Sequence, residues 1–153
     1  SKHEGDLYLD GLTQLSDAAA ESLSKHKGGE IRLSGLKSLT DCSGHIALAK
    51  KLRKSNGSHL SLDKLTEMSG KAAKTLRVHK GPLSLNGLTK LSDQAAEGLA
   101  KHKDTLSLEG LTEISDAAAQ SLAKKEPKFD SFYINLDNLP ESAAQILRDA
   151  GHG

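Results

Sequence analysis

The chain has 153 residues, of which 27% are charged, 36% are apolar and only 3% are aromatic, and its formal net charge is +1. Near-neutrality leaves no overall field that would draw nucleic acid or an anionic membrane to the protein. The single cysteine, Cys42, excludes an internal disulfide framework and a cysteine-based zinc site, and no apolar run approaches the ~18 residues of a membrane span. We expect no cofactor, no nucleic-acid partner and no membrane insertion, while the compartment is not indicated.

Leucine fills 26 positions and recurs in a repeated motif. The motif is clearest in LYLDGLTQLSDAAAESLSKHKG from Leu7, LSLNGLTKLSDQAAEGLAKHKD from Leu83 and LSLEGLTEISDAAAQSLAKKEP from Leu106. Segments from Ile31 and Leu60 fit the same template, and a looser copy reads INLDNLPESAAQILRDAG. The pattern predicts one repeat domain over residues 1–153, with 1–6 as the tail of a truncated repeat and units at 7–30, 31–59, 60–82, 83–105, 106–130 and 131–153.

Each unit changes its hydrophobic period halfway. In the fourth unit Leu83 and Leu85 alternate with polar residues, which indicates a short strand, and Leu91, Ala95 and Leu99 then follow at the spacing of one helix face. Helix starts are marked by a hydroxyl residue that can act as N-cap, followed in four units by an aspartate: Ser16-Asp17, Thr40-Asp41, Ser69, Ser92-Asp93 and Ser115-Asp116. Pro140 takes the N-cap place in the last unit, and the longer second unit predicts extra helical turns between Asp41 and Leu52.

A strand, a turn and a helix in so few residues bury their leucines only by stacking on neighbouring units. We therefore expect an α/β fold of about six strand–turn–helix units, with a parallel sheet on a concave face and the helices on the convex face. The consensus LxLxGLxxLSDxAAxxLAxHK resembles a short bacterial variety of leucine-rich repeat, and this resemblance implies a leucine-rich-repeat solenoid that recognises macromolecules on its sheet. The sequence departs from the commonest form of this repeat, because the asparagine that usually ladders just after the strand is missing and the matching positions hold Gly11, Gly35, Lys64, Gly87 and Gly110.

The concave face holds the candidate binding residues. Its members are the outward residues of the strands and the residues just after them: Tyr8, Asp10, Arg32, Ser34, Ser61, Asp63, Ser84, Asn86, Ser107 and Glu109, flanked by Glu30, His59, Pro82 and Thr105. An unidentified protein or glycan is the expected partner, and a merely solvated sheet is the alternative. Asp10, Asp63 and Glu109 stand on alternate units, ~10 Å apart, which is too far for a shared calcium ion. No nucleophile elbow or phosphate loop occurs, so we expect a non-enzymatic module.

The two ends of the chain differ in sequence. Residues 2–6 copy the tail of a unit, so we expect either the C-terminal segment of a longer array or an N-terminal edge that pairs with another chain. A structural or spacer role through this edge is the alternative function. The aromatic residues Phe129, Phe132 and Tyr133 suggest a C-terminal cap.

Histidine and lysine recur near the predicted helix ends. His3, His26, His79 and His102 share one repeat position, which Ser55 and Lys125 interrupt. Binding of backbone carbonyls at the helix ends is favoured over metal binding there. A basic rim is predicted from Lys25, Lys27, Arg53, Lys54, Arg77, Lys80, Lys101, Lys103, Lys124 and Lys125. Compensation of the helix dipoles explains this rim better than a polyanion does, and Cys42 is expected to be a packed, inert thiol.

Overall fold

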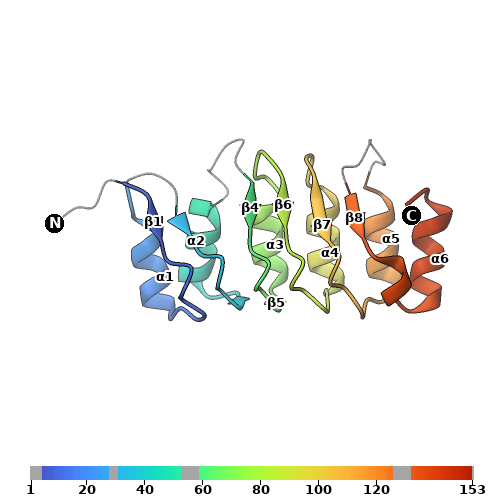
Figure 1. The fold of residues 1–153 in the computed structure, drawn as a ribbon, viewed down its shortest axis with the longest axis horizontal. Coiled ribbons are helices and arrows are strands. Elements are labelled where there is room, and N and C mark those ends of the chain that lie inside the picture. Colours follow the sequence, from blue (N-terminus) through green and yellow to red (C-terminus); the bar gives the residue numbers. More distant parts are fainter. Residues whose placement is uncertain (1–4, 28–30, 53–58, 126–131, 153) are drawn as a thin grey trace.

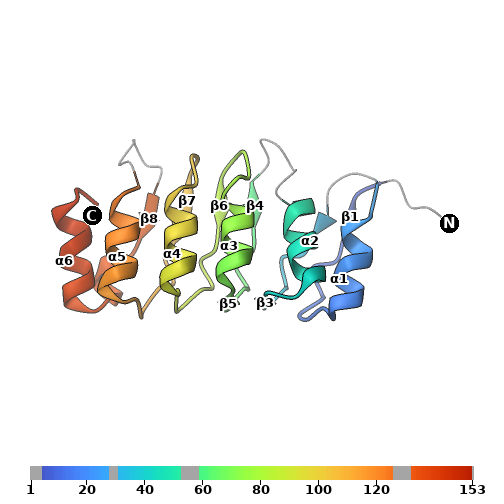
Figure 2. The ribbon, with the colours of Figure 1, turned by 180° about the vertical axis from the view of Figure 1, so that it is seen from behind.

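The computed structural model describes residues 5–27, 31–52, 59–125 and 132–152, which form an α/β fold of two layers (Figure 1). The helices stand in one row, α1 Asp17–Ser24, α2 Ser43–Leu52, α3 Gly70–Leu76, α4 Asp93–Ala100, α5 Asp116–Ala123 and α6 Glu141–Asp149. The strands are short: β1 Leu7–Tyr8, β2 Ile31–Arg32, β3 Ser38–Leu39, β4 Leu60–Ser61, β5 Glu67–Met68, β6 Leu83–Ser84, β7 Leu106–Leu108 and β8 Phe132–Ile134. Seen from behind, the helices cover one side of the strand layer (Figure 2).

All strand pairs of the described residues are parallel, and each joins neighbouring units. In the longest sheet, of order β4-β6-β7-β8, Leu83 is paired with Leu106, so equivalent positions of the repeat lie side by side. β1 and β2 form a separate pair, and β3 pairs with β5 at the other end of the units. The expectation of one continuous sheet is therefore wrong, because no sheet hydrogen bonds join β2 to β4 within the described residues. The β3–β5 pair was not anticipated.

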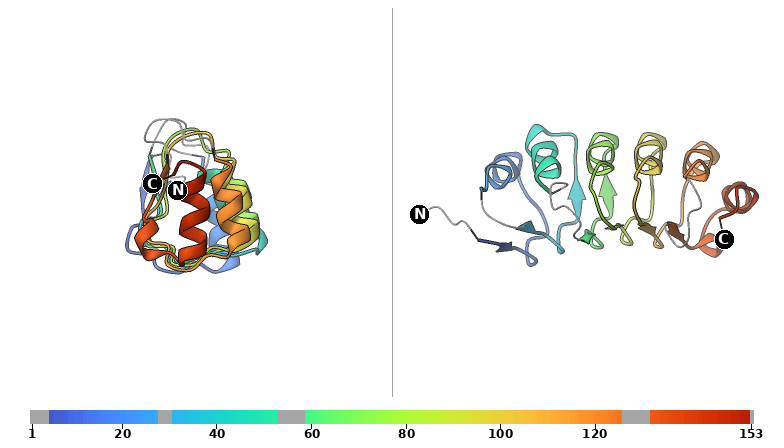
Figure 3. Two further views of the ribbon diagram at one scale, coloured as in Figure 1. Left: turned by 90° about the vertical axis from the view of Figure 1, so that its right-hand side faces the viewer. Right: turned by 90° about the horizontal axis from the view of Figure 1, so that it is seen from above.

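The core lies between the layers and consists of the inward leucines and the helix alanines. Leu62, Leu85 and Leu108 are fully buried, and so are Ala72 and Ala95, where small side chains let the helix approach the strands. The view from above shows the row of helices and the strand layer facing each other along the length of the molecule (Figure 3). The predicted inward positions are thus confirmed, although Leu7, Leu9, Leu15 and Leu23 of the first unit are only partly buried.

Helix starts follow the predicted capping chemistry in four units. The hydroxyl groups of Ser16, Ser69, Ser92 and Ser115 accept the N–H of the third helix position, at 3.0–3.1 Å. The aspartate after the cap has a second use: Asp116 Oδ1 accepts the Ser142 hydroxyl of the next unit at 2.7 Å, and Asp93 accepts the Ser115 hydroxyl. Each such aspartate ties its own helix start to the next one. Pro140 stands at the N-cap of α6, as expected, and makes no side-chain cap bond.

The second unit departs from the predicted helix start. Helix α2 begins at Ser43, so Thr40 is not its N-cap and Asp41 is not in its first turn. The Thr40 N–H instead donates to His45 Nδ1, while Asp17 of the preceding unit accepts the Gly44 N–H at the start of α2. Helix α2 has ten residues against eight in α1, which is less than one extra turn, and the rest of the insertion lies outside the described residues.

Candidate functional site

The strand face is the surface formed by the outward strand residues and by the residue one or two positions after each strand, namely Asp10, Ser34, Asp63, Asn86 and Glu109. At three units this following residue ties its unit to the next: Asp10 Oδ1 accepts the Ser34 N–H at 3.0 Å, Asp63 Oδ1 the Asn86 N–H at 2.9 Å, and Asn86 Oδ1 the Glu109 N–H at 3.0 Å. A side-chain ladder therefore exists one residue ahead of the glycine positions. The expectation that the ladder asparagine is missing is therefore wrong, because Asn86 belongs to the ladder and Asp10 and Asp63 accept the equivalent N–H groups as an asparagine does.

Asp63 is the centre of this ladder. Its carboxylate accepts the hydroxyls of Ser84 at 2.5 Å and Ser61 at 3.1 Å in addition to the Asn86 N–H. Burial opposes ionisation of Asp63, but these hydrogen bonds outweigh it and lower the pKa of the carboxyl. Ser84, predicted to be exposed, is only 5% accessible because it lies within this network. Ser107 similarly donates to Asn86 Oδ1 at 2.6 Å.

Eight of the ten candidate residues divide into two groups, and the other two, Ser34 and Glu109, donate their backbone N–H groups to the ladder. In the first group the side chains form hydrogen bonds with one another: Ser61, Asp63, Ser84, Asn86 and Ser107. This favours a structural role for this part of the face.

The other group is exposed. Tyr8 is 62% accessible, and the Arg32 guanidinium lies 5.4 Å from the centre of its ring and 3.7 Å from Asp10 Oδ2. The Ser34 backbone N–H, followed by the Ser34 hydroxyl and the charge of Arg32, lowers the pKa of Asp10. An aromatic ring, a cation and an anion thereby meet on β1 and β2.

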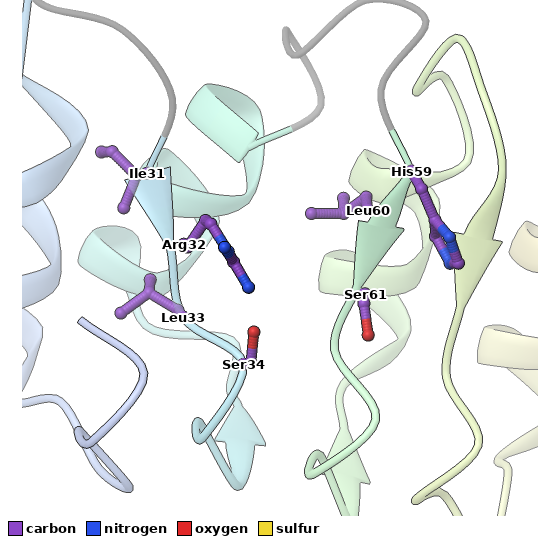
Figure 4. A pocket seen from close by; sticks show the side chains of 7 residues that line it. All are labelled: Ile31, Arg32, Leu33, Ser34, His59, Leu60 and Ser61. Atoms are coloured by element: carbon purple, nitrogen blue, oxygen red, sulfur yellow. The ribbon is translucent and has the colours of Figure 1, made fainter. Parts of the chain in front are cut away.

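A polar hollow of about 390 Å³ adjoins this cluster, between β2 and β4. Figure 4 shows Arg32 and Ser34 on its β2 side and His59 and Ser61 on its β4 side. The two strand edges facing the hollow are not paired with each other. The hollow therefore offers backbone N–H and C=O groups together with charged and hydroxyl side chains.

Two residues at this break differ from those at the β1–β2, β4–β6 and β6–β7 junctions. A Cβ atom added at Gly35, Gly87 or Gly110 would collide with the carbonyl oxygen of the preceding unit, so close stacking requires glycine there. The third unit has Lys64 at this position, and Ser34 stands where the first, third and fourth units carry the ladder aspartate or asparagine.

Tyr133, which was expected only as part of the C-terminal cap, is also a residue of the strand face. It is 41% accessible and lies beside Ser107 in the β7–β8 register. The alternation Phe132-Tyr133-Ile134 was the signal that would have placed it. Glu30 and Phe129 lie outside the described residues, whereas His59 is exposed and Pro82 and Thr105 are partly buried.

Two of the recurring histidines, His26 and His102, contact backbone carbonyl groups, but those of the preceding unit rather than of their own helix. His102 Nδ1 lies 3.0 Å from the Arg77 carbonyl and its Nε2 lies 3.1 Å from the Gly81 carbonyl. His26 contacts the Gly5 carbonyl in the same way, and Lys125 donates to the His102 carbonyl at 2.6 Å. Lys125 is 4% accessible, so it does not belong to a basic rim. His3, Ser55, Arg53 and Lys54 lie outside the described residues.

No group of three or more histidine, cysteine, aspartate or glutamate side chains among the described residues is arranged to hold a metal ion. Cys42 is partly buried and its sulfur accepts the Thr40 hydroxyl at 3.1 Å. None of the described helices has the length and apolarity needed to cross a bilayer. Comparisons of this chain with models of protein families, with curated proteins and with solved structures found no match.

Proposed function

We propose that this chain is a solenoid of the leucine-rich-repeat type, and that it works as a non-enzymatic module that binds a protein through the N-terminal half of its strand face. The observation that carries the proposal is the exposed cluster of Tyr8, Arg32 and Asp10 beside the hollow between β2 and β4. Tyrosine and arginine are the residues that contribute most to binding at protein interfaces.

The surroundings of the cluster support this choice. Further along the face the polar side chains bind one another, so a partner would have to break those hydrogen bonds before making its own. Around Tyr8 and Arg32 the contacts are exposed ion-pair and cation–ring contacts, which cost little to rearrange. The adjoining hollow, with its unpaired strand edges, suits the main chain of a polypeptide.

The experiment is a quantitative capture from extracts of the source cells, comparing the native chain with a Tyr8→Ala/Arg32→Ala variant. Asp63 is left unchanged because its carboxylate holds the ladder together. Tyr133→Ala is the matched control, since it removes an exposed tyrosine from the same face at the other end. Circular dichroism and the melting temperature establish that all three proteins are folded alike.

A protein retained by the native chain and by the Tyr133 variant, and lost by the double variant, is the expected result. Equal retention by all three proteins would contradict the proposed site. Loss of the retained material after glycosidase treatment of the extract would replace the protein partner by a glycan.

A further inference from the structure

The N-terminal end face of the molecule is apolar and uncovered by the other described elements. A hollow of about 440 Å³ lies on it, lined mainly by Leu7, Leu9, Leu12, Leu15, Ala19 and Leu23. These residues come from β1, α1 and the segment between them, at the end of the row of units (Figures 1 and 3). Exposed apolar surface of this kind marks a site of contact.

The residue equivalent to Leu12 is buried in each of the next four units. Leu12 is 37% accessible, whereas its counterparts Leu36, Leu65, Leu88 and Leu111 are all fully buried. Leucine holds this position in all five units, so the difference lies in what stands in front of it. In the later units the preceding unit covers this leucine.

Gly11 differs from the equivalent glycines of the later units in its surroundings. At Gly35, Gly87 and Gly110 a side chain would collide with the main-chain carbonyl of the preceding unit, which is that of Asp10, Asp63 and Asn86 respectively. At Gly11 an added Cβ atom meets nothing within 4 Å. Nothing described in the structure requires glycine here, yet the position carries the residue that close approach of another backbone demands.

The opposite end of the molecule does not supply the matching surface. In the last unit the Asn135 carbonyl, counterpart of the carbonyls that lie over the glycines, accepts the Asn138 N–H at 3.3 Å. Helix α6 exposes polar residues there, and Arg148 pairs with Asp137 at 3.9 Å. Head-to-tail association with a second copy therefore lacks an apolar partner surface.

We infer that the N-terminal end face is a docking surface for a further strand–turn–helix unit of the same repeat type. The strand of that unit continues the sheet beyond β1, and its main-chain carbonyl lies over Gly11. The aspartate or asparagine after its strand accepts the Asp10 N–H, as Asp10 accepts the Ser34 N–H. The inference is independent of the strand-face proposal, because it uses the end of the stack rather than its open side.

The test supplies such a unit. A copy of residues 83–100, which includes the ladder residue Asn86, is placed directly ahead of residue 1, so that residues 1–6 complete the added repeat. Gly11→Ala is then made in the native and in the extended chain, with Gly35→Ala as the matched control in both. Thermal unfolding and hydrogen exchange of the Asp10 and Leu12 amides are measured on all six proteins.

The extended chain is expected to melt at a higher temperature than the native chain and to slow exchange at Asp10. Gly11→Ala leaves the native chain nearly unchanged and lowers the melting temperature of the extended chain by about as much as Gly35→Ala lowers it in either chain. An extended chain that tolerates Gly11→Ala, or that gains neither stability nor protection, would overturn the inference. So would a native chain that sediments as a dimer and is dissociated by Leu12→Glu, because the face would then pair with its own copy.

Discussion

Asp63 shows how a side chain that faces solvent in the sequence pattern becomes part of the framework. It follows a strand, as Asn86 does one unit later, and both accept the backbone N–H of the next unit through Oδ1. Asp63 also accepts two serine hydroxyls, one of them the buried Ser84. Removing it leaves three donors without their acceptor, whereas asparagine retains an amide oxygen at the same place.

We predict that Asp63→Ala lowers the free energy of unfolding by about 1–3 kcal/mol and that Asp63→Asn lowers it by about half of that or less. Urea unfolding of the three proteins at neutral pH is the measurement. Equal losses in the two variants would mean that the charge, rather than the hydrogen-bonding oxygen, is what the ladder needs.

His102 predicts a dependence of stability on pH. Burial, reinforced by the charge of Lys125, lowers its pKa, and this outweighs the bonds to the Arg77 and Gly81 carbonyls and the charge of Asp104. In the unfolded chain His102 has an ordinary histidine pKa of about 6.5, so near this pH the unfolded chain binds more protons than the folded chain. Stability is therefore lost as the pH falls from about 7 through this value.

The free energy of unfolding measured from about pH 7.5 to 5.5 is expected to fall with pH in the native chain and to fall less steeply in His102→Gln. Parallel curves for the two proteins would show that the pKa of His102 is unshifted. His79, whose ring stacks on that of His102 at 6.5 Å, is kept in both proteins.

At the scale of the element, the strands are too short to be stable by themselves, and the packing of their inward leucines on the helices supports them. The β6 residues Leu83 and Ser84 alternate inward and outward, and the next inward residue, Leu85, is fully buried. Helix α4 presents Ala95 and Leu99 to the same layer, and both are fully buried. The stability of each unit therefore rests on a few side chains.

We expect Leu85→Ala and Leu108→Ala each to lower the free energy of unfolding by about 2–5 kcal/mol, because each leaves a cavity in this layer. Thr89→Ala, an exposed position of the fourth unit, is the control and should change it by less than about 0.5 kcal/mol. Chemical denaturation measures all three, and a Leu85 variant as stable as the control would contradict the inward assignment.

At the scale of the whole molecule, the break between β2 and β4 divides the strand layer at one junction. The second and third units remain connected there through β3 and β5. At the β1–β2, β4–β6 and β6–β7 junctions the first unit carries a ladder aspartate or asparagine and the second a glycine, and Ser34 and Lys64 hold these two positions at the break.

Restoring both residues, in Ser34→Asp/Lys64→Gly, is predicted to close the break. The Leu33 N–H would then donate to the Ser61 carbonyl, as the Leu85 N–H donates to the Ser107 carbonyl at 2.9 Å. We expect a rise in stability of about 1 kcal/mol or more and slower hydrogen exchange at Leu33. Unchanged exchange at Leu33 would show that these two residues do not keep the strands apart.

The sequence by itself determined the repeat, the alternation of strand and helix, the inward leucines and four helix caps. These are local properties: they depend on periods of two and 3.6 residues and on a hydroxyl placed just ahead of a helix. Five strands accordingly begin at the first residue of a predicted unit, Leu7, Ile31, Leu60, Leu83 and Leu106.

The tertiary structure alone decided which outward side chains are hydrogen-bonded to a neighbouring unit and where the sheet is interrupted. Ser84 and Tyr8 hold the same repeat position, yet one is 5% and the other 62% accessible. The difference arises from neighbours more than twenty residues away in the chain, such as Asp63 beside Ser84. Contacts between residues so far apart in the chain depend on how closely two units stack. The periodicity within one unit carries no information about the spacing between units.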